Sequence, residues 1–199
     1  MNNNIKLKRN GDGERFSTLA LLGENLFHSD DIANIWGIHN KNTLHKTLSR
    51  YVKRGLMYRI NKGFYSINKI NEVDPYFLGV KSLHRPAYIS CESVLYEKGI
   101  LNQPPQRITI VSSVSKSFSI GNYNYKSRQI KDDYLLNNYG VETINGVRIA
   151  SLERAIVDML YFNGDKYFDS KNSKLIRWNK VKSIIKNIGY KINYNDITK

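Results

Sequence analysis

The stretch that decides the fold runs from Ser29 to Ile67 and reads SDDIANIWGIHNKNTLHKTLSRYVKRGLMYRINKGFYSI. Ser29 can cap a short helix, because a serine hydroxyl accepts a hydrogen bond from a backbone N–H of the first turn. Asp30 and Asp31 follow in that turn, where the helix dipole favours negative charge. The pattern therefore predicts a short helix that begins at this serine and ends at Gly37.

A second helix is predicted from about Asn42 to Arg54, after a tight turn. Apolar residues recur at i, i+4, i+7 and i+8, which places them on one side of the helix; they are Leu44, Leu48, Tyr51 and Val52. Polar and basic residues occupy the opposite side; they are Lys46, Ser49, Arg50 and Lys53, with Thr43 and His45 near the N-terminal end. Gly55 suits the C-cap that ends this helix.

Two short strands are predicted after the second helix. Leu56–Ile60 and Phe64–Ile67 flank Asn61-Lys62-Gly63, a loop whose glycine suits a positive φ. A tight helix pair followed by such a hairpin is typical of a winged helix-turn-helix, in which the second helix enters the major groove of DNA and the hairpin forms the wing. Duplex DNA is therefore the leading candidate ligand.

The charge of this stretch supports a DNA ligand. No Asp or Glu occurs between Ile32 and Asn71, whereas eight lysines and arginines do. Because DNA is a polyanion, cations on a groove-reading helix and on a wing meet its electrostatic demands. The candidate DNA-binding residues are Lys41, Asn42, Thr43, His45, Lys46, Ser49, Arg50 and Lys53 on the helix, and Arg59, Asn61 and Lys62 on the hairpin. The alternative is a protein-docking module with a solvated basic face.

The composition of the whole chain sets outer bounds on its class. With 199 residues, 41% of them hydrophobic, the chain is long enough for two modest domains. A net charge of +14 favours an acidic partner. The single cysteine excludes an intramolecular disulfide. The sequence shows neither a signal peptide nor an apolar run long enough to span a bilayer, so we expect a cytoplasmic protein without a membrane partner.

The predicted elements divide into two domains. Residues 12–70 form the winged helix-turn-helix, whose first helix runs from Phe16 to Leu26. Residues 75–199 form an α+β domain with an antiparallel sheet. Its predicted elements are a helix from Ser90 to Gly99, a strand Arg107–Val111, hairpins over Lys116–Ile130 and Val141–Ile149, a helix from Ser151 through Leu160, and a basic helix Lys180–Ile188.

Several motifs resemble those of a known family. They are Asp74-Pro75, RPAYISCESVLYEKGI at Arg85–Ile100, RITIVSS at Arg107–Ser113, and RIASLERAIVDML at Arg148–Leu160. Together with the winged helix, and over about residues 16–162, they are similar to the AbiEi-type antitoxins of AbiE-like type IV toxin-antitoxin and phage-defence systems. The resemblance implies an N-terminal winged helix that represses its own operon. It also implies a C-terminal antitoxin domain that neutralises a nucleotidyltransferase-like toxin.

If the family resemblance is set aside, most of the same motifs are typical of residues at the start of a helix. Ser90 and Ser151 are suited to N-caps, and Glu92 and Glu153 follow where a first turn favours acids. The functional alternative places Glu153, Arg154 and Asp158 at an edge of the domain that faces a partner. The arginine and the aspartate are four residues apart, so an intrahelical ion pair is the commoner explanation.

The sequence shows no pattern of catalytic or cofactor-binding residues. It has no phosphate-binding glycine loop, no HExxH and no metal-ligand cluster. We therefore predict no catalytic residue, cofactor or metal, and no enzyme activity. Cys91 beside a helix start is typical of a small buried residue, and the alternative is a thiol nucleophile.

Two other functions remain open from the sequence: a stand-alone winged-helix regulator, and a subunit of an enzyme that processes nucleic acid. The lysine-rich end also bears on function. Lys171–Lys199 contains eight basic residues and one acidic residue. It is therefore a candidate for a second electrostatic contact with DNA, with a solvated helix face as the alternative.

Overall fold

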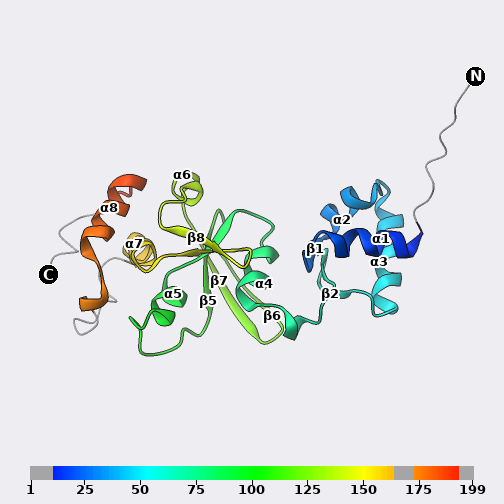
Figure 1. Cartoon of the computed structure of the whole chain (residues 1–199), viewed down its shortest axis with the longest axis horizontal. Coiled ribbons are helices and arrows are strands. Elements are labelled where there is room, and N and C mark those ends of the chain that lie inside the picture. Colours follow the sequence, from blue (N-terminus) through cyan, green and yellow to red (C-terminus); the bar gives the residue numbers. More distant parts are fainter. Residues whose placement is uncertain (1–10, 164–172, 193–199) are drawn as a thin grey trace, which may run out of the picture. The chain divides into compact units, whose positions relative to one another are not determined.

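The computed structural model describes residues 11–163 and 173–192, and the chain divides into two compact units, Met1–Val73 and Asp74–Lys199 (Figure 1). Unit 1 is the first of these and unit 2 the second. Each has its own core and its own sheet, so each is described by itself.

Unit 1 contains three helices and a small sheet. Its elements are α1 (Asp12–Leu21), β1 (Leu26–His28), α2 (Ser29–Trp36), α3 (Lys41–Lys53), β2 (Tyr58–Asn61) and β3 (Phe64–Ser66), followed by a 3-10 turn at Ile70–Glu72. The sheet order is β1-β3-β2, and both strand pairs are antiparallel. The predicted second helix and hairpin are therefore present.

An aromatic cluster holds the three helices of unit 1 together. Trp36 of α2 lies against Tyr51 of α3, with ring centroids 5.3 Å apart. Phe16 of α1 stacks on the same tyrosine at 6.4 Å. The indole Nε1 of Trp36 also donates to the carbonyl of Arg15 at 2.9 Å, which satisfies its polar atom on burial. Each helix of unit 1 thus contributes to one core.

The start of unit 1 differs from the sequence-based prediction. The first helix ends at Leu21 rather than Leu26, and Leu26 begins β1, where it pairs with Ser66. Ser29 is the first residue of α2 and not its cap; His28 is the N-cap, and its backbone N–H donates to the Asp31 carboxylate at 3.3 Å. This strand was missed because three residues carry too little periodicity to be recognised.

Unit 2 is an α+β structure built on one six-stranded sheet. Its elements are α4 (Pro75–Ser82), β4 (Ala87–Ile89), α5 (Glu92–Glu97), β5 (Ile108–Ser112), β6 (Lys116–Ile120), β7 (Tyr123–Gln129), α6 (Asp132–Leu136), β8 (Val141–Ile144), β9 (Val147–Ala150), α7 (Leu152–Asn163), a 3-10 turn at Ser173–Leu175 and α8 (Trp178–Ile188). The strand order is β6-β7-β5-β4-β9-β8.

The sheet of unit 2 is mixed, which corrects the prediction of an antiparallel sheet. Both predicted hairpins are present, and Asn145 and Gly146 have the positive φ values that a tight hairpin turn needs. However, β4 pairs with β9 and β5 pairs with β7 in parallel. Hairpin signals report only strands that follow one another directly, whereas each of these parallel pairs joins strands with at least one other strand between them in the sequence.

Helices cover both faces of this sheet. Ile110 of β5 points toward α4, where a Cβ added at Gly79 would meet its side chain and the ring of Tyr125. Thr109, the preceding residue, points the opposite way, and its hydroxyl donates to the Glu92 carboxylate of α5 at 3.0 Å. Because successive strand residues alternate between faces, α4 and α5 lie on opposite faces. The helix α7 packs with α5, and α8 packs on α7 (Figure 1).

Candidate nucleic-acid interface

The candidate interface in unit 1 begins with a well-capped α3. The Asn40 side-chain oxygen accepts from the Thr43 backbone N–H at 3.0 Å and from its hydroxyl at 3.3 Å. At the other end, Gly55 adopts a φ of +70°, and its backbone N–H donates to Val52. These caps fix α3 at Lys41–Lys53, within one residue of the range predicted at each end.

The two sides of α3 have opposite character. The side toward the core carries Leu44, Thr47, Leu48 and Tyr51, which are buried. All the predicted DNA-binding residues of the helix are exposed, namely Lys41, Asn42, Thr43, His45, Lys46, Ser49, Arg50 and Lys53. Five of them, His45, Lys46, Ser49, Arg50 and Lys53, line a surface groove of about 460 Å³. The helix therefore brings its polar and basic side chains onto one outward face.

The β2–β3 hairpin carries the remaining predicted residues. Arg59, Asn61 and Lys62 are all exposed. Asn61 belongs to β2 rather than to the loop, and the register shifts between Arg59 and Asn61. The Arg59 Nε donates to the carbonyl of Asn61 at 3.4 Å, across this irregularity. Three polar side chains are thus displayed near the tip of one hairpin.

A backbone hydrogen bond anchors this hairpin to the helices. The Ser29 N–H, at the start of α2, donates to the carbonyl of Gly63 at 2.8 Å. Gly63 has a φ of +77°, and a Cβ there would lie 3.2 Å from the Ser29 hydroxyl oxygen. The turn therefore favours glycine for its conformation and for space. Ser29 is the first residue of α2 and not its predicted cap, and its backbone N–H contacts the hairpin.

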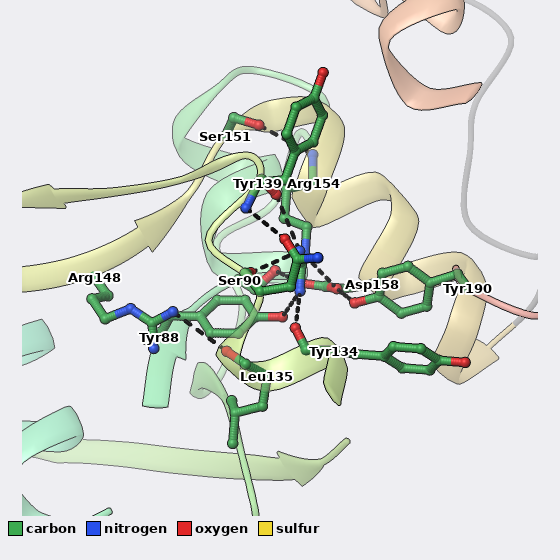
Figure 2. A network of polar contacts seen from close by, with 11 residues as sticks. Tyr88, Ser90, Tyr134, Leu135, Tyr139, Arg148, Ser151, Arg154, Asp158 and Tyr190 are labelled. Carbon is green, nitrogen blue, oxygen red and sulfur yellow. Dashed lines mark hydrogen bonds and ion pairs between the residues drawn. The ribbon is translucent and has the colours of Figure 1, made fainter. Parts of the chain in front are cut away.

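The second candidate region contains Arg154 and Asp158 of α7, which form a fully buried ion pair (Figure 2). The arginine Nε donates to an Asp158 oxygen at 3.1 Å, as the i,i+4 spacing predicts. Its other nitrogens donate to the Tyr88 hydroxyl at 2.9 Å and to the carbonyls of Tyr134 and Tyr139 at 2.8 and 3.1 Å. The pair lies in the core. The alternative that Arg154 and Asp158 form an edge facing a partner is therefore wrong.

Hydroxyl groups complete the contacts of Asp158. Ser90 donates to it at 2.7 Å, and Tyr190 donates to its other oxygen. Burial, and secondarily the charge of Asp158, raise the pKa of Tyr190, so this phenol stays protonated and remains a donor. Ser90 therefore does not cap α5, and Cys91 is the N-cap residue instead. Ser151 does accept from the Arg154 N–H at 3.2 Å, as an N-cap should.

Glu153 is also buried and faces α8. Its carboxylate accepts from Arg177 at 2.6 Å and lies 3.8 Å from Lys180. Burial alone would raise the pKa of this carboxyl, but the hydrogen bond from Arg177 and the nearby positive charges lower it below its usual value. Two cations of the lysine-rich end are thus engaged within unit 2. Residues 171–172 and 193–199 of that stretch lie outside the described residues.

Cys91 is completely buried, in agreement with the prediction of a small buried residue. Burial raises the pKa of its thiol well above the usual value, and the charge of Asp158 adds to the rise. Within residues 11–163 and 173–192, no group of three or more His, Cys, Asp and Glu side chains could hold a metal ion. In the same part of the chain, no helix is both long enough and apolar enough to cross a membrane.

Comparisons with known proteins bear on the fold alone. No family model matches the chain, and no curated protein matches it. The chain is similar in structure to the RV2827C protein from Mycobacterium tuberculosis, with a TM-score of 0.54 and 12% sequence identity. The match covers 91% of this chain and 71% of that one. At this identity the likeness shows a shared α+β fold.

Several supporting residues were missed by sequence reasoning. Asn40 had a recognisable signal, since an asparagine three residues before Thr43 is a standard N-cap arrangement. Tyr88 and Tyr190 contact the buried ion pair, but the sequence carries no signal for this role. Tyrosine is common in protein cores because its ring packs well, whether or not its hydroxyl has a specific partner. Only the folded chain shows that their hydroxyls are used.

Replacing Asp158 with asparagine should destabilise unit 2 by about 3–5 kcal/mol, because it leaves the buried Arg154 charge without its counter-ion. Chemical denaturation of the full chain measures this loss. Glu142→Gln is the control, since Glu142 is exposed on β8 and its change should stay within about 0.5 kcal/mol. Equal stability of the two variants would contradict the structural importance of the pair.

Proposed function

We propose that the chain is a sequence-specific DNA-binding transcriptional repressor and the antitoxin of an AbiE-like type IV toxin-antitoxin or phage-defence system. In this proposal unit 1 is a winged helix-turn-helix, with α3 as its recognition helix and the β2–β3 hairpin as its wing. The observation that carries the DNA-binding half is the exposed polar and basic face of α3, which lies opposite its buried side.

Base reading is assigned to the exposed face of α3, from its first turn to Arg50 in its last turn. Asn42, Thr43, Lys46 and Arg50 are exposed there, and their side chains carry the donors and acceptors that base edges present in the major groove. The Thr43 hydroxyl hydrogen is directed to Asn40, so its oxygen is left as an acceptor. Lysine and arginine fit guanine, and asparagine fits adenine.

Phosphate contacts are assigned to the hairpin. Arg59 and Lys62 lie close together near its tip, and the segment from residue 33 to 70 contains no acidic residue that could neutralise them. Contacts to phosphates position a protein on the duplex without reading sequence. The anchor between Ser29 and Gly63 supports this role, because it holds the hairpin against the helices that it would help to orient.

The antitoxin half of the proposal rests on the resemblance of the motifs in unit 2. These motifs contribute β4, α5, β5, β9 and α7, and they supply Tyr88, Ser90, Arg154 and Asp158 of the buried network. Their internal position supports a scaffold role. Neutralisation of a toxin would then use exposed residues of unit 2, which the scaffold holds in place.

Substitution of Arg50 by alanine should weaken binding to the operator of the chain's own operon by about 1–3 kcal/mol and relax the base preference at one position. Lys69→Ala is the matched control, because it removes one exposed positive charge outside α3 and the hairpin. Selection from a randomised operator library measures the preference. An unchanged preference in the Arg50 variant would show that α3 is not the reading helix.

The double variant Arg59→Ala/Lys62→Ala should weaken binding to all duplex sequences about equally. The slope of log affinity against log salt is negative, and each lost phosphate contact reduces its magnitude by about 0.9. The double variant should therefore have a slope that is shallower by about 1.8. Titrations from 50 to 200 mM salt measure it. A slope equal to that of the unsubstituted protein would remove the hairpin from the interface.

The two activities should be separable by mutation, because they are assigned to different units. Lys46→Ala/Arg50→Ala should derepress the operon and retain toxin neutralisation, whereas Met159→Asp should abolish neutralisation by placing a charge in the core of unit 2. The assay is co-expression with an adjacent toxin gene under a foreign promoter, with growth and reporter repression scored separately. Failure of the full chain to rescue growth would leave only the DNA-binding regulator.

A further inference from the structure

The six-stranded sheet of unit 2 has two open edges in the part of the chain that the structure describes. The strand order β6-β7-β5-β4-β9-β8 makes β6 one edge and β8 the other. An edge strand presents backbone N–H and C=O groups that can pair with another chain. Both edges are accessible to such a partner, since each has exposed residues; they are Lys116, Ser117 and Ser119 on β6, and Glu142, Thr143 and Ile144 on β8.

The two ends of the sheet carry opposite charge. Residues 115–131, which include β6 and β7, contain four basic residues and no acidic residue. Residues 132–147, which include α6 and β8, contain three acidic residues and no basic residue, in a chain whose net charge is +14. Because surfaces of opposite charge attract, each end of the sheet matches the charge of the other end.

One row of residues joins the two edges. Directly paired residues follow one another across all six strands, in the order Lys116, Ser127, Ile110, Ile89, Ile149 and Glu142. Residues directly opposite each other on neighbouring strands share a face of the sheet. Lys116 and Glu142 are therefore the two ends of one row, on the same face and at opposite edges.

The strand directions allow this row to continue into a second copy of the chain. Three of the five neighbouring strand pairs are antiparallel, so β6 and β8 run in opposite directions. A second copy placed in the same orientation therefore brings its β8 antiparallel to β6 of the first copy. The continued row sets Glu142 of the second copy opposite Lys116. It also sets Thr143 of the second copy opposite Ser115, which directly precedes β6. Opposite charges and hydroxyl pairs both stabilise antiparallel strands.

Charged side chains on edge strands also serve to prevent association. Such protection is complete when both edges carry the same sign, because every pairing between copies then brings like charges together. In unit 2 the signs at Lys116 and Glu142 differ, so the charges oppose the pairing of β6 with β6 and of β8 with β8. They favour the pairing of β6 with β8, which is also the pairing that continues the row.

We propose that unit 2 associates head to tail with other copies of this chain, by antiparallel pairing of the β6 edge of one copy with the β8 edge of the next. The contact joins two different edges, so each copy keeps one edge free for a further copy. The two strands have only five and four residues. They bury less than the roughly 1,000 Å² of a stable interface, so the association is weak and reversible. This association goes beyond the proposed function, which does not specify how many copies act together.

The test is sedimentation equilibrium of the full-length protein without nucleic acid, from about 10 to about 500 µM. The salt concentration is about 150 mM, at which repulsion between net charges is screened beyond about 8 Å. The average mass of the unsubstituted protein should rise with concentration and pass that of a dimer, as an open head-to-tail contact requires. Lys116→Glu and Glu142→Lys should each lower the association constant about tenfold or more, because each sets like charges opposite one another.

The double variant Lys116→Glu/Glu142→Lys should restore the association constant to within about threefold, because it exchanges the two charges and leaves the net charge unchanged. Net charge alone predicts a different pattern. Lys116→Glu lowers the net charge and Glu142→Lys raises it, so general repulsion would move the two single variants in opposite directions. Lys98→Glu is the matched control, since Lys98 is exposed outside both edge strands, and it should not lower the association constant. Thermal unfolding of each variant checks that the fold is retained.

Three results would overturn the inference: a monomer mass at every concentration, opposite effects of the two single variants, or no recovery in the double variant. A mass that stops at a dimer and responds to one edge alone would also overturn it, in favour of a closed pair of like edges. None of these measurements involves DNA or a toxin. The proposed function therefore stands or falls separately, by the operator and growth experiments.

Discussion

Arg154 and Asp158 form an ion pair in the interior of unit 2. Several elements of that unit supply the hydrogen bonds that these two buried charges require. An isolated buried charge costs several kcal/mol, so Arg154 and Asp158 each require a full set of partners. Those partners come from β4, from α6 and the segment after it, and from the residue that follows the C-cap of α8. A polar network of this kind fixes one arrangement of elements more tightly than apolar contacts alone.

In each unit, the residues that hold the fold together are distinct from the exposed residues available for binding. The motif residues that form the polar network, Tyr88, Ser90, Arg154 and Asp158, are internal, so substitutions there would act through stability. The residues proposed to contact DNA are external, on α3 and on the β2–β3 hairpin. In unit 1 the aromatic cluster around Tyr51 takes the scaffold role, and the outward face of α3 is left to bind.

The sequence predicted features that depend on neighbouring residues. The bounds of α3 and the turn at Asn145-Gly146 follow from local signals, and the structure confirms them. Long-range contacts were not predictable: β1 and β4 have only three residues each, and the parallel pairs join distant strands. Ser90 shows the same limit, because Asp158, 68 positions away, takes the hydroxyl that a local rule assigns to a helix cap. The exposure of the candidate site was predictable, since periodicity separates the two sides of α3.

The contact between Asp158 and Tyr190 also sets an order of events during synthesis. Tyr88 and Tyr190 are about a hundred residues apart, and ribosomes add about 5–20 residues per second. The network of unit 2 therefore stays incomplete for at least several seconds after its first tyrosine has been added. Unit 1 needs nothing from this network, so its three helices and small sheet can form before Tyr190 has been added to the chain. Under the proposed function, the unit assigned to DNA binding would therefore fold before the unit assigned to toxin neutralisation.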